Sequence, residues 1–359
     1  MGKPMLGFFR KRSGLQIIWN TAGLLAIVLF CVNNPSCAQT RAVASSQTTG
    51  KHAPSTLRDA SFHSASLSRE MHYRVLLPAN YDAATQRYPT LVLLHGLYGD
   101  YKNWSTLTKL SKYARALNLI IAMPDAGNSW YVDSATVPAD KYEDYIVQDF
   151  IQEIDAHYRT KPERSARAVA GLSMGGYAAV KFALKYPNLF SYVGGISAAL
   201  GAAGDLDETH PEFRDGLRKA FGETGNPVRQ QNDVFPLLEG ADIKALPYVY
   251  LDCGSGDMFL GVNRKFVAQL QQLKIPYEFH EMPGGHEWKY WDGAIQRFLN
   301  VLVSQNFAKR MRRVGNVSVL DSRSSTCLVS RISSVPTLCE QNQLVIESLL
   351  NFVAHRLCK

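Results

Sequence analysis

Apolar and polar positions along the middle of the chain form blocks that predict strands and helices in turn. Short apolar runs typical of buried strands lie at 73–77, 90–94, 119–123, 168–170, 192–196, 248–251 and 277–280. Between these runs, apolar residues recur at helical spacing over 106–116, 142–154, 177–184, 211–221, 259–273 and 290–303. This alternation predicts an α/β fold, in which a mostly parallel sheet is covered by helices on both faces.

The alternation is confined to residues 61–303, which we expect to form one folded domain. Residues 39–60 are rich in Ser, Thr, Ala and Gln and predict a flexible leader. Within the domain, the polar and Gly-rich stretch 198–240 interrupts the pattern and is a candidate cap over a pocket. Residues 304–359 form a basic, Ser-rich tail in which we find no motif that assigns a role.

The first 38 residues have the three parts of a secretory signal peptide. A basic stretch through Arg12 precedes the apolar run 24–32, and Ser36-Cys37-Ala38 then offers a small-x-small site, with cleavage after Ala38. The alternative is an uncleaved segment that anchors the protein in a membrane. We expect a secreted or periplasmic protein, with no stable membrane insertion after the signal peptide is removed.

The charge is unevenly distributed, and this excludes nucleic acid as a partner of the central domain. The net charge is +8, but residues 1–38 carry four basic and no acidic residues, and residues 304–359 carry eight basic and three acidic residues. Residues 39–303 are therefore near neutral and carry no basic footprint for nucleic acid. One cysteine in this region, Cys253, cannot form a disulfide framework, and we expect it to be a small buried residue.

The most informative motif is Gly171-Leu172-Ser173-Met174-Gly175, which matches G-x-S-x-G. It lies between a predicted buried strand and a predicted helix. In the α/β-hydrolase fold this turn lifts a serine nucleophile out of the sheet, and glycines flank the serine because the strand and the helix pack closely there. Ser173 is therefore the predicted nucleophile.

A serine nucleophile needs a base to accept its proton and an acid to orient that base. His286 follows the last predicted strand in a Gly-rich loop before the final helix, where the chain order Ser, Asp or Glu, His places the base. For the acid, Asp252 and Asp257 both follow the strand at 248–251. The pattern favours Asp257, because its side chain can reach the His286 loop, but it leaves Asp252 open as a residue that caps local backbone amides.

The tetrahedral intermediate of acyl transfer needs N–H donors for its oxyanion. Met174 N–H, directly after the nucleophile, is one expected donor, and Leu97 N–H in the Gly-rich loop after the strand at 90–94 is the other. We expect His95 to position this loop by hydrogen bonding. Trp130 lies in a loop that reaches the same rim, where it is a candidate to line the acyl or alcohol site or simply to pack.

Together these residues resemble the esterase D-like branch of the α/β-hydrolases, and especially bacterial tributyrin-esterase-like carboxylesterases. The resemblance covers about residues 65–303 and does not include the tail. It is carried by Leu93-Leu94-His95-Gly96, Met123-Pro124-Asp125 with Ser129-Trp130-Tyr131, Gly171–Tyr177, Asp252-Cys253-Gly254 with Asp257, and Gly284–Trp288. It implies an α/β-hydrolase fold with Asp257 as the triad acid and a serine hydrolase that uses no metal or other cofactor. Its relatives include S-formylglutathione hydrolases, feruloyl and acetylxylan esterases, and mycolyltransferases.

The leading hypothesis is a secreted serine carboxylesterase that acts on short acyl esters of small molecules or carbohydrates. An acyltransferase of the mycolyltransferase type would form the same acyl-enzyme but pass it to an alcohol. A thioesterase like S-formylglutathione hydrolase fits the motifs but fits export poorly, because glutathione is chiefly cytosolic. A non-catalytic binding protein is disfavoured, because such proteins usually lose a member of the triad and all three are present here.

Overall fold

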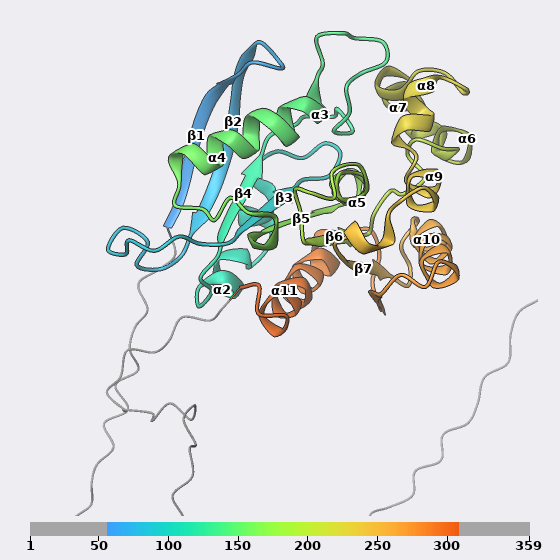
Figure 1. The fold of residues 1–359 in the computed structure, drawn as a ribbon. Helices are drawn as coiled ribbons and strands as arrows, with labels where there is room; N and C mark the ends of the chain where they lie inside the picture. Colours follow the sequence, from blue (N-terminus) through green and yellow to red (C-terminus); the bar gives the residue numbers. More distant parts are fainter. Residues whose placement is uncertain (1–55, 309–359) are drawn as a thin grey trace, which may run out of the picture. The chain divides into compact units, whose positions relative to one another are not determined.

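The computed structural model describes residues 56–308, which contain one mixed sheet of eight strands in the order β1-β2-β4-β3-β5-β6-β7-β8 (Figure 1). Strands β3 to β8 are parallel, whereas β1 pairs antiparallel with β2 and β2 pairs antiparallel with β4. The strands are β1 Thr56–Ser64, β2 Arg69–Leu77, β3 Thr90–Leu94, β4 Ile120–Pro124, β5 Arg167–Leu172, β6 Tyr192–Ile196, β7 Tyr248–Gly254 and β8 Tyr277–Met282. This topology and the helices around it confirm the predicted α/β-hydrolase fold.

Helices cover both faces of the sheet (Figure 1). The α-helices are α1 Asn103–Leu107, α2 Leu110–Ala114, α3 Tyr142–Asp144, α4 Ile151–His157, α5 Met174–Lys185, α6 Leu206–Thr209, α7 Arg214–Phe221, α8 Pro227–Asn232, α9 Val234–Glu239, α10 Leu260–Gln272 and α11 Trp288–Ser304. A π-helical segment, Tyr145–Phe150, joins α3 to α4, and single 3₁₀ turns lie at Arg164–Ala166, Pro211–Phe213 and Ile243–Ala245.

The core is divided by the sheet into two layers, as the side-chain alternation of a buried strand requires. Along β3, Val92 and Leu94 point to the layer that contains α5, whereas Leu91 and Leu93 point to the layer that contains α11. Because both faces are covered, all five side chains of β3 are buried. The strand therefore reads as a continuous apolar run in the sequence.

Several predicted boundaries differ from those in the structure. β1 begins at Thr56, so the end of the predicted leader 39–60 belongs to the sheet. The predicted helix 106–116 is two short helices, α1 and α2, because the chain turns at Thr108 and Lys109. The segment 198–240 contains α6 to α9, and α9 packs against α5. The chain remains in the core beyond the predicted domain end, because Phe307 and Ala308 are buried.

The predicted signal peptide, most of the leader and the tail from residue 309 lie outside the described residues. Among residues 56–308, no helix combines the length and the apolar character needed to cross a membrane.

Candidate active site

Ser173 lies in the sharp turn between β5 and α5, in a conformation that a serine rarely adopts. Its φ angle is +53°, and its side chain is nearly buried. The flanking glycines are required by close packing: a Cβ on Gly171 would lie 2.4 Å from the Gly175 backbone, and one on Gly175 would lie 2.5 Å from the His95 carbonyl oxygen. The close packing at the two glycines holds Ser173 in this strained conformation at the end of the strand.

The structure brings Ser173, His286 and Asp257 into one hydrogen-bonded chain, although they come from three separate loops. His286 Nε2 lies 3.0 Å from Ser173 Oγ, and His286 Nδ1 lies 3.0 Å and 3.1 Å from the two carboxylate oxygens of Asp257. These are hydrogen-bond distances at both links. The arrangement is the one in which a serine hydroxyl loses its proton to an oriented imidazole.

The surroundings of Asp257 keep it ionised. Burial by itself would raise the pKa of this carboxyl, but the hydrogen bond and charge of His286 outweigh it and lower the pKa. The backbone N–H of Phe259, 2.9 Å from Oδ1, and the Ser197 hydroxyl lower it further. An ionised Asp257 can accept Nδ1–H of His286, which leaves Nε2 free to accept a proton.

Asp252, the other candidate acid, lies in a separate cluster. It pairs through both carboxylate oxygens with Arg297, at 2.7 Å and 2.9 Å, and accepts hydrogen bonds from the Tyr250 and Tyr290 hydroxyls. Its side chain is fully buried. Asp252 therefore joins β7 to α11, the helix that begins two residues after His286, and its hydrogen bonds go to Arg297 and the two tyrosines.

Of the two expected oxyanion donors, Leu97 lines the same pocket as Ser173, and Met174 is the first residue of α5, directly after Ser173. Neither Leu97 N–H nor Met174 N–H has a hydrogen-bond acceptor within residues 56–308, so both are free to bind a developing negative charge. The loop of Leu97 is held by its neighbour Tyr98, whose N–H donates to Asn128 Oδ1 at 2.7 Å and whose φ angle is +61°. This loop connects the Ser173 region to the segment after β4.

His95 takes the positioning role that the sequence predicts for it. Its side chain is buried, its Nε2 accepts the Ala126 N–H at 3.0 Å, and its Nδ1 lies 2.8 Å from the Gly96 carbonyl oxygen. The pair of contacts fits a neutral ring protonated on Nδ1. His95 thus ties the loop of Leu97 to the segment after β4.

A pocket of about 360 Å³ lies over Ser173 and His286. Its wall is largely aromatic, and Trp130, Phe213, Phe259 and Trp291 contribute to it. Phe213 comes from the 198–240 segment, so part of the predicted cap does border the pocket. Trp130 also packs edge-on against Phe213 and against Tyr177 of α5.

Three residues that the sequence did not single out support the imidazole. The rings of Phe259 and Trp291 stand nearly perpendicular to the His286 ring, with centroid distances of 5.1 Å and 4.9 Å. Trp291 Nε1 donates to Ser197 Oγ at 3.0 Å, and Ser197 is the residue whose hydroxyl lies at Asp257. The only sequence signal for Ser197 is its place directly after β6, beside the strand that ends at the nucleophile.

Within residues 56–308, no group of three or more His, Cys, Asp or Glu side chains is arranged to hold a metal ion. Cys253 is buried, and burial raises the pKa of its thiol, as expected for a packed residue with no thiolate chemistry.

Residues 64–300 match the family model "Putative esterase". The chain belongs to this esterase family. The acetyl esterase of Caldicellulosiruptor saccharolyticus is 24% identical over 249 residues, which are 65% of this chain and 93% of that protein. Substrate-bound FphF, a fluorophosphonate-binding serine hydrolase of Staphylococcus aureus, is 28% identical, with a TM-score of 0.63 over 70% of this chain and 99% of the other.

The S-formylglutathione hydrolase FrmB of Staphylococcus aureus is a second similar structure. It is 27% identical, with a TM-score of 0.58, and the match covers 69% of this esterase and 99% of FrmB. The resemblance to the esterase D-like family is thereby confirmed. This esterase is a serine hydrolase that acts on carboxylic esters.

Proposed function

We propose that this esterase is secreted and hydrolyses short-chain acyl esters through an acyl-enzyme formed on Ser173. The observation that carries the proposal is the hydrogen-bonded chain from Ser173 Oγ through His286 to Asp257, whose first two members line a pocket of about 360 Å³. A small pocket with a nucleophile at its base favours short acyl groups. Export rests on the basic, apolar and small-residue pattern of residues 1–38.

In the first half of the reaction, Ser173 Oγ attacks the ester carbonyl carbon and its proton passes to His286 Nε2. The carbonyl oxygen becomes an oxyanion, which the N–H groups of Leu97 and Met174 stabilise. The carbon–oxygen bond to the alcohol then breaks, and the imidazolium returns its proton to the departing alkoxide. Asp257 remains ionised and keeps the imidazole in one orientation throughout.

In the second half, water takes the place of the alcohol. His286 removes a proton from the water as its oxygen attacks the acyl carbon, and the same N–H groups hold the second oxyanion. Collapse of this intermediate breaks the bond to Ser173, whose oxygen recovers the proton from His286. The products are a carboxylic acid, an alcohol and the unchanged enzyme.

Hydrolysis of p-nitrophenyl esters from acetate to palmitate tests the proposal. We expect activity to be greatest with the short esters and to fall with chain length, and we expect Ser173→Ala to lose at least about a thousandfold in kcat, because no nucleophile remains. Equal activity in Ser173→Ala would show that the reaction does not use this serine. A preference for palmitate would contradict the short-chain assignment.

The acyltransferase alternative shares the acyl-enzyme and differs only in what accepts the acyl group. Product analysis with a short ester, with and without glycerol or a sugar as acceptor, separates the two. We expect free acid in both mixtures. Acyl transfer to the alcohol as the main product would favour the transferase.

A further inference from the structure

Trp130 forms part of the active-site wall and is held rigidly. It follows β4 and lines the pocket beside Leu97 and Phe213, and its side chain is only 1% exposed. Its ring makes edge contacts with Tyr177 and Phe213, with centroid distances of 6.4 Å in both cases. The indole thus has packed neighbours on the sides that do not face the pocket.

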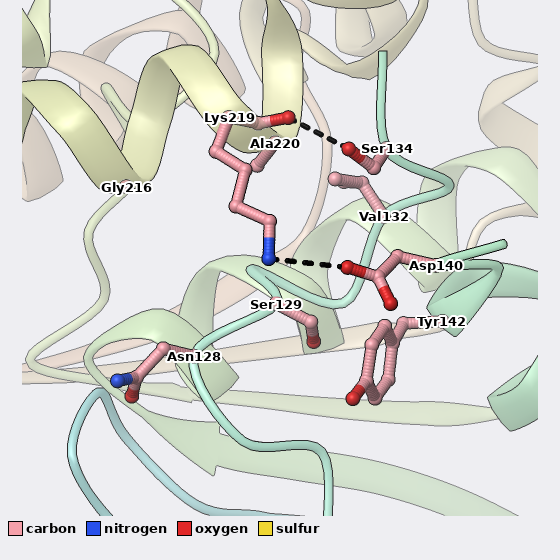
Figure 2. Close-up of a pocket in the computed structure, with 9 residues that line it drawn as sticks. All are labelled: Asn128, Ser129, Val132, Ser134, Asp140, Tyr142, Gly216, Lys219 and Ala220. Atoms are coloured by element: carbon pink, nitrogen blue, oxygen red, sulfur yellow. Dashed lines mark hydrogen bonds and ion pairs between the residues drawn. The ribbon is translucent and has the colours of Figure 1, made fainter. Parts of the chain in front are cut away.

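A second cavity is lined by residues of the same loop and of α7, drawn in Figure 2. It measures about 180 Å³ and is lined by Ser129 and Val132, which flank the pair Trp130-Tyr131 in the sequence, and by Gly216 and Ala220 of α7. A Cβ on Gly216 would lie 3.6 Å from Trp130 Nε1, so this edge of the indole faces the helix that borders the second cavity. The indole therefore lines the first cavity, and its Nε1 edge packs against a residue that lines the second.

The indole N–H is buried, and it has no hydrogen-bond partner within the described part of the chain. A buried donor without a partner is uncommon in folded proteins and calls for an explanation. Here no acceptor stabilises the position of the ring, which is held by packing against Tyr177, Phe213 and Phe221. Shape, and not hydrogen bonding, is what this side chain contributes.

The backbone at Trp130 is held in an unfavourable conformation. Trp130 and Tyr131 have φ angles of +56° and +55°. Bulky aromatic residues seldom adopt positive φ angles, and the conformation costs free energy at each of the two residues. Buried Lys181 donates to the Tyr131 carbonyl oxygen at 2.6 Å, and the Tyr131 hydroxyl donates to the His95 carbonyl oxygen at 3.1 Å. These two contacts fix the loop and thereby the direction of the indole.

The reaction geometry fixes on which side of Ser173 the alcohol part of the ester lies. The departing alkoxide must receive its proton from His286 Nε2, so the alcohol part of the ester lies on the side of His286. That side is occupied by Phe259 and Trp291, which contact the imidazole. The acyl chain then lies along the rest of the pocket wall, to which Leu97, Trp130 and Phe213 contribute.

We propose that Trp130 is the end wall of the acyl side of the pocket and sets the longest acyl chain that the enzyme accepts. This inference rests on the proposed esterase mechanism at Ser173 and adds the residue that determines its specificity. A small side chain at 130 would join the cavity of about 360 Å³ to the cavity of about 180 Å³. The second cavity is bordered by Lys219 and Asp140, which form an ion pair at 3.2 Å and are drawn in Figure 2, and the Lys219 side chain is exposed to solvent.

The test compares kcat/KM for p-nitrophenyl butyrate and octanoate in the full chain and its variants. We expect Trp130→Ala to raise the octanoate-to-butyrate ratio about tenfold or more, since single methylenes in a pocket change specificity by such factors. Trp130→Phe keeps most of the wall, and we expect its ratio to stay within about threefold of the parent. Trp130→Leu is the milder truncation to use where Trp130→Ala does not fold, and its ratio shifts the same way.

Two further variants distinguish a specific opening of the pocket wall at Trp130 from a general loss of protein stability. Phe150→Ala leaves a cavity at a fully buried aromatic residue outside the pocket, so we expect lower stability with an unchanged ratio. Gly216→Leu introduced together with Trp130→Ala refills the joined space, so we expect the ratio to return toward that of the parent.

The outcomes distinguish this inference from the proposed function. A folded Trp130→Ala or Trp130→Leu enzyme with the parental octanoate-to-butyrate ratio would overturn the role of Trp130 as the end wall, but not the proposed short-chain hydrolysis. An equal rise of the ratio in Phe150→Ala would also overturn it. Loss of all ester hydrolysis in the parent would instead contradict the proposed function itself.

Discussion

Asp252 and Asp257 both follow the apolar core of β7, but their carboxylates meet different groups. Asp252 is shared by Arg297 and two tyrosine hydroxyls in a buried cluster. Asp257 lies 3.0 Å from His286 Nδ1 and can orient that ring. At the scale of single residues, one aspartate therefore supports the fold and the other supports the proposed chemistry.

Replacing each aspartate by asparagine tests this division. We expect Asp257→Asn to lower kcat by about 100-fold to 10,000-fold with little change in the urea midpoint, because an amide stabilises the wrong imidazole tautomer. We expect Asp252→Asn to destabilise the protein by about 3 kcal/mol, because it leaves Arg297 without its partner, while the folded enzyme keeps most of its kcat. Both variants are measured by ester hydrolysis kinetics and by urea unfolding. A loss of kcat in Asp252→Asn and a loss of stability in Asp257→Asn would mean that Asp252 is the catalytic acid and Asp257 the structural residue.

The sequence pattern favours Asp257 as the acid but leaves Asp252 open, and only the family resemblance implies Asp257. The sequence identifies Ser173 and His286 because each lies in a motif between a recognisable strand and a recognisable helix. In the structure, His286 Nε2 lies 3.0 Å from Ser173 Oγ. The choice between the aspartates depends on which residues face each carboxylate across β7 and α11. Ser197 and Trp291 carry no local signal for the same reason, because their roles arise from contacts between distant segments.

At the scale of elements, a buried ion pair connects α3 to α5. Glu143 of α3 accepts from Lys181 Nζ at 2.6 Å and also contacts Lys185 and the Tyr186 hydroxyl, all from α5 or its end. Lys181 is fully buried, and it also holds the carbonyl oxygen of Tyr131 in the loop beside the active site. The pair thus links the helix that begins at the nucleophile to the wall of the pocket.

The pKa of Glu143 makes this link sensitive to acid. Burial would raise that pKa, but the ammonium groups of Lys181 and Lys185 lower it from 4.5 to about 2. A carboxylate whose pKa is lowered in the folded state stabilises that state above its unfolded pKa and loses this contribution as the pH falls toward the folded value. The stabilisation from Glu143 is therefore complete above about pH 5 and declines toward about pH 2.

Thermal unfolding of the parent and Glu143→Gln as a function of pH checks this expectation. At pH 7 we expect Glu143→Gln to be less stable by about 3 kcal/mol, because Lys181 loses its buried partner. Between pH 4.5 and pH 2 the two melting temperatures should converge, because protonated Glu143 resembles glutamine. A gap of constant size across this range would mean that Glu143 does not act through its charge.

The elements that the sequence misses have weak local signals. β1 is an edge strand paired only with β2, and residues 57–63 alternate between exposed and half-buried, so its pattern resembles that of a polar leader. The predicted helix 106–116 breaks because Asp292 of α11 accepts the Lys109 N–H at 2.7 Å. In both places a contact with a segment distant in sequence decides the local structure. The central parallel strands are predicted well because burial on both faces leaves continuous apolar runs.

At the scale of the whole molecule, the last described residues complete the layer on the α11 face of the sheet. The chain turns after α11, and Phe307 places its ring 5.0 Å from the Tyr192 ring at the start of β6. Phe307 is only 8% exposed and belongs to the same apolar cluster as α11. The sequence pattern ends the domain at Val303, since helical periodicity stops there, and so excludes this contact.

The contribution of this segment can be measured by urea unfolding. We expect Phe307→Ala in the full chain to lower the free energy of unfolding by about 3 kcal/mol, because it leaves a cavity against Tyr192. Among shortened chains, residues 39–308 should be more stable than residues 39–303 by at least this amount, since the latter lacks the whole segment. Equal midpoints for the two shortened chains would show that Phe307 adds nothing to the core. Because the segment packs on the layer opposite α5, we expect the folded Phe307→Ala enzyme to keep its kcat for short esters.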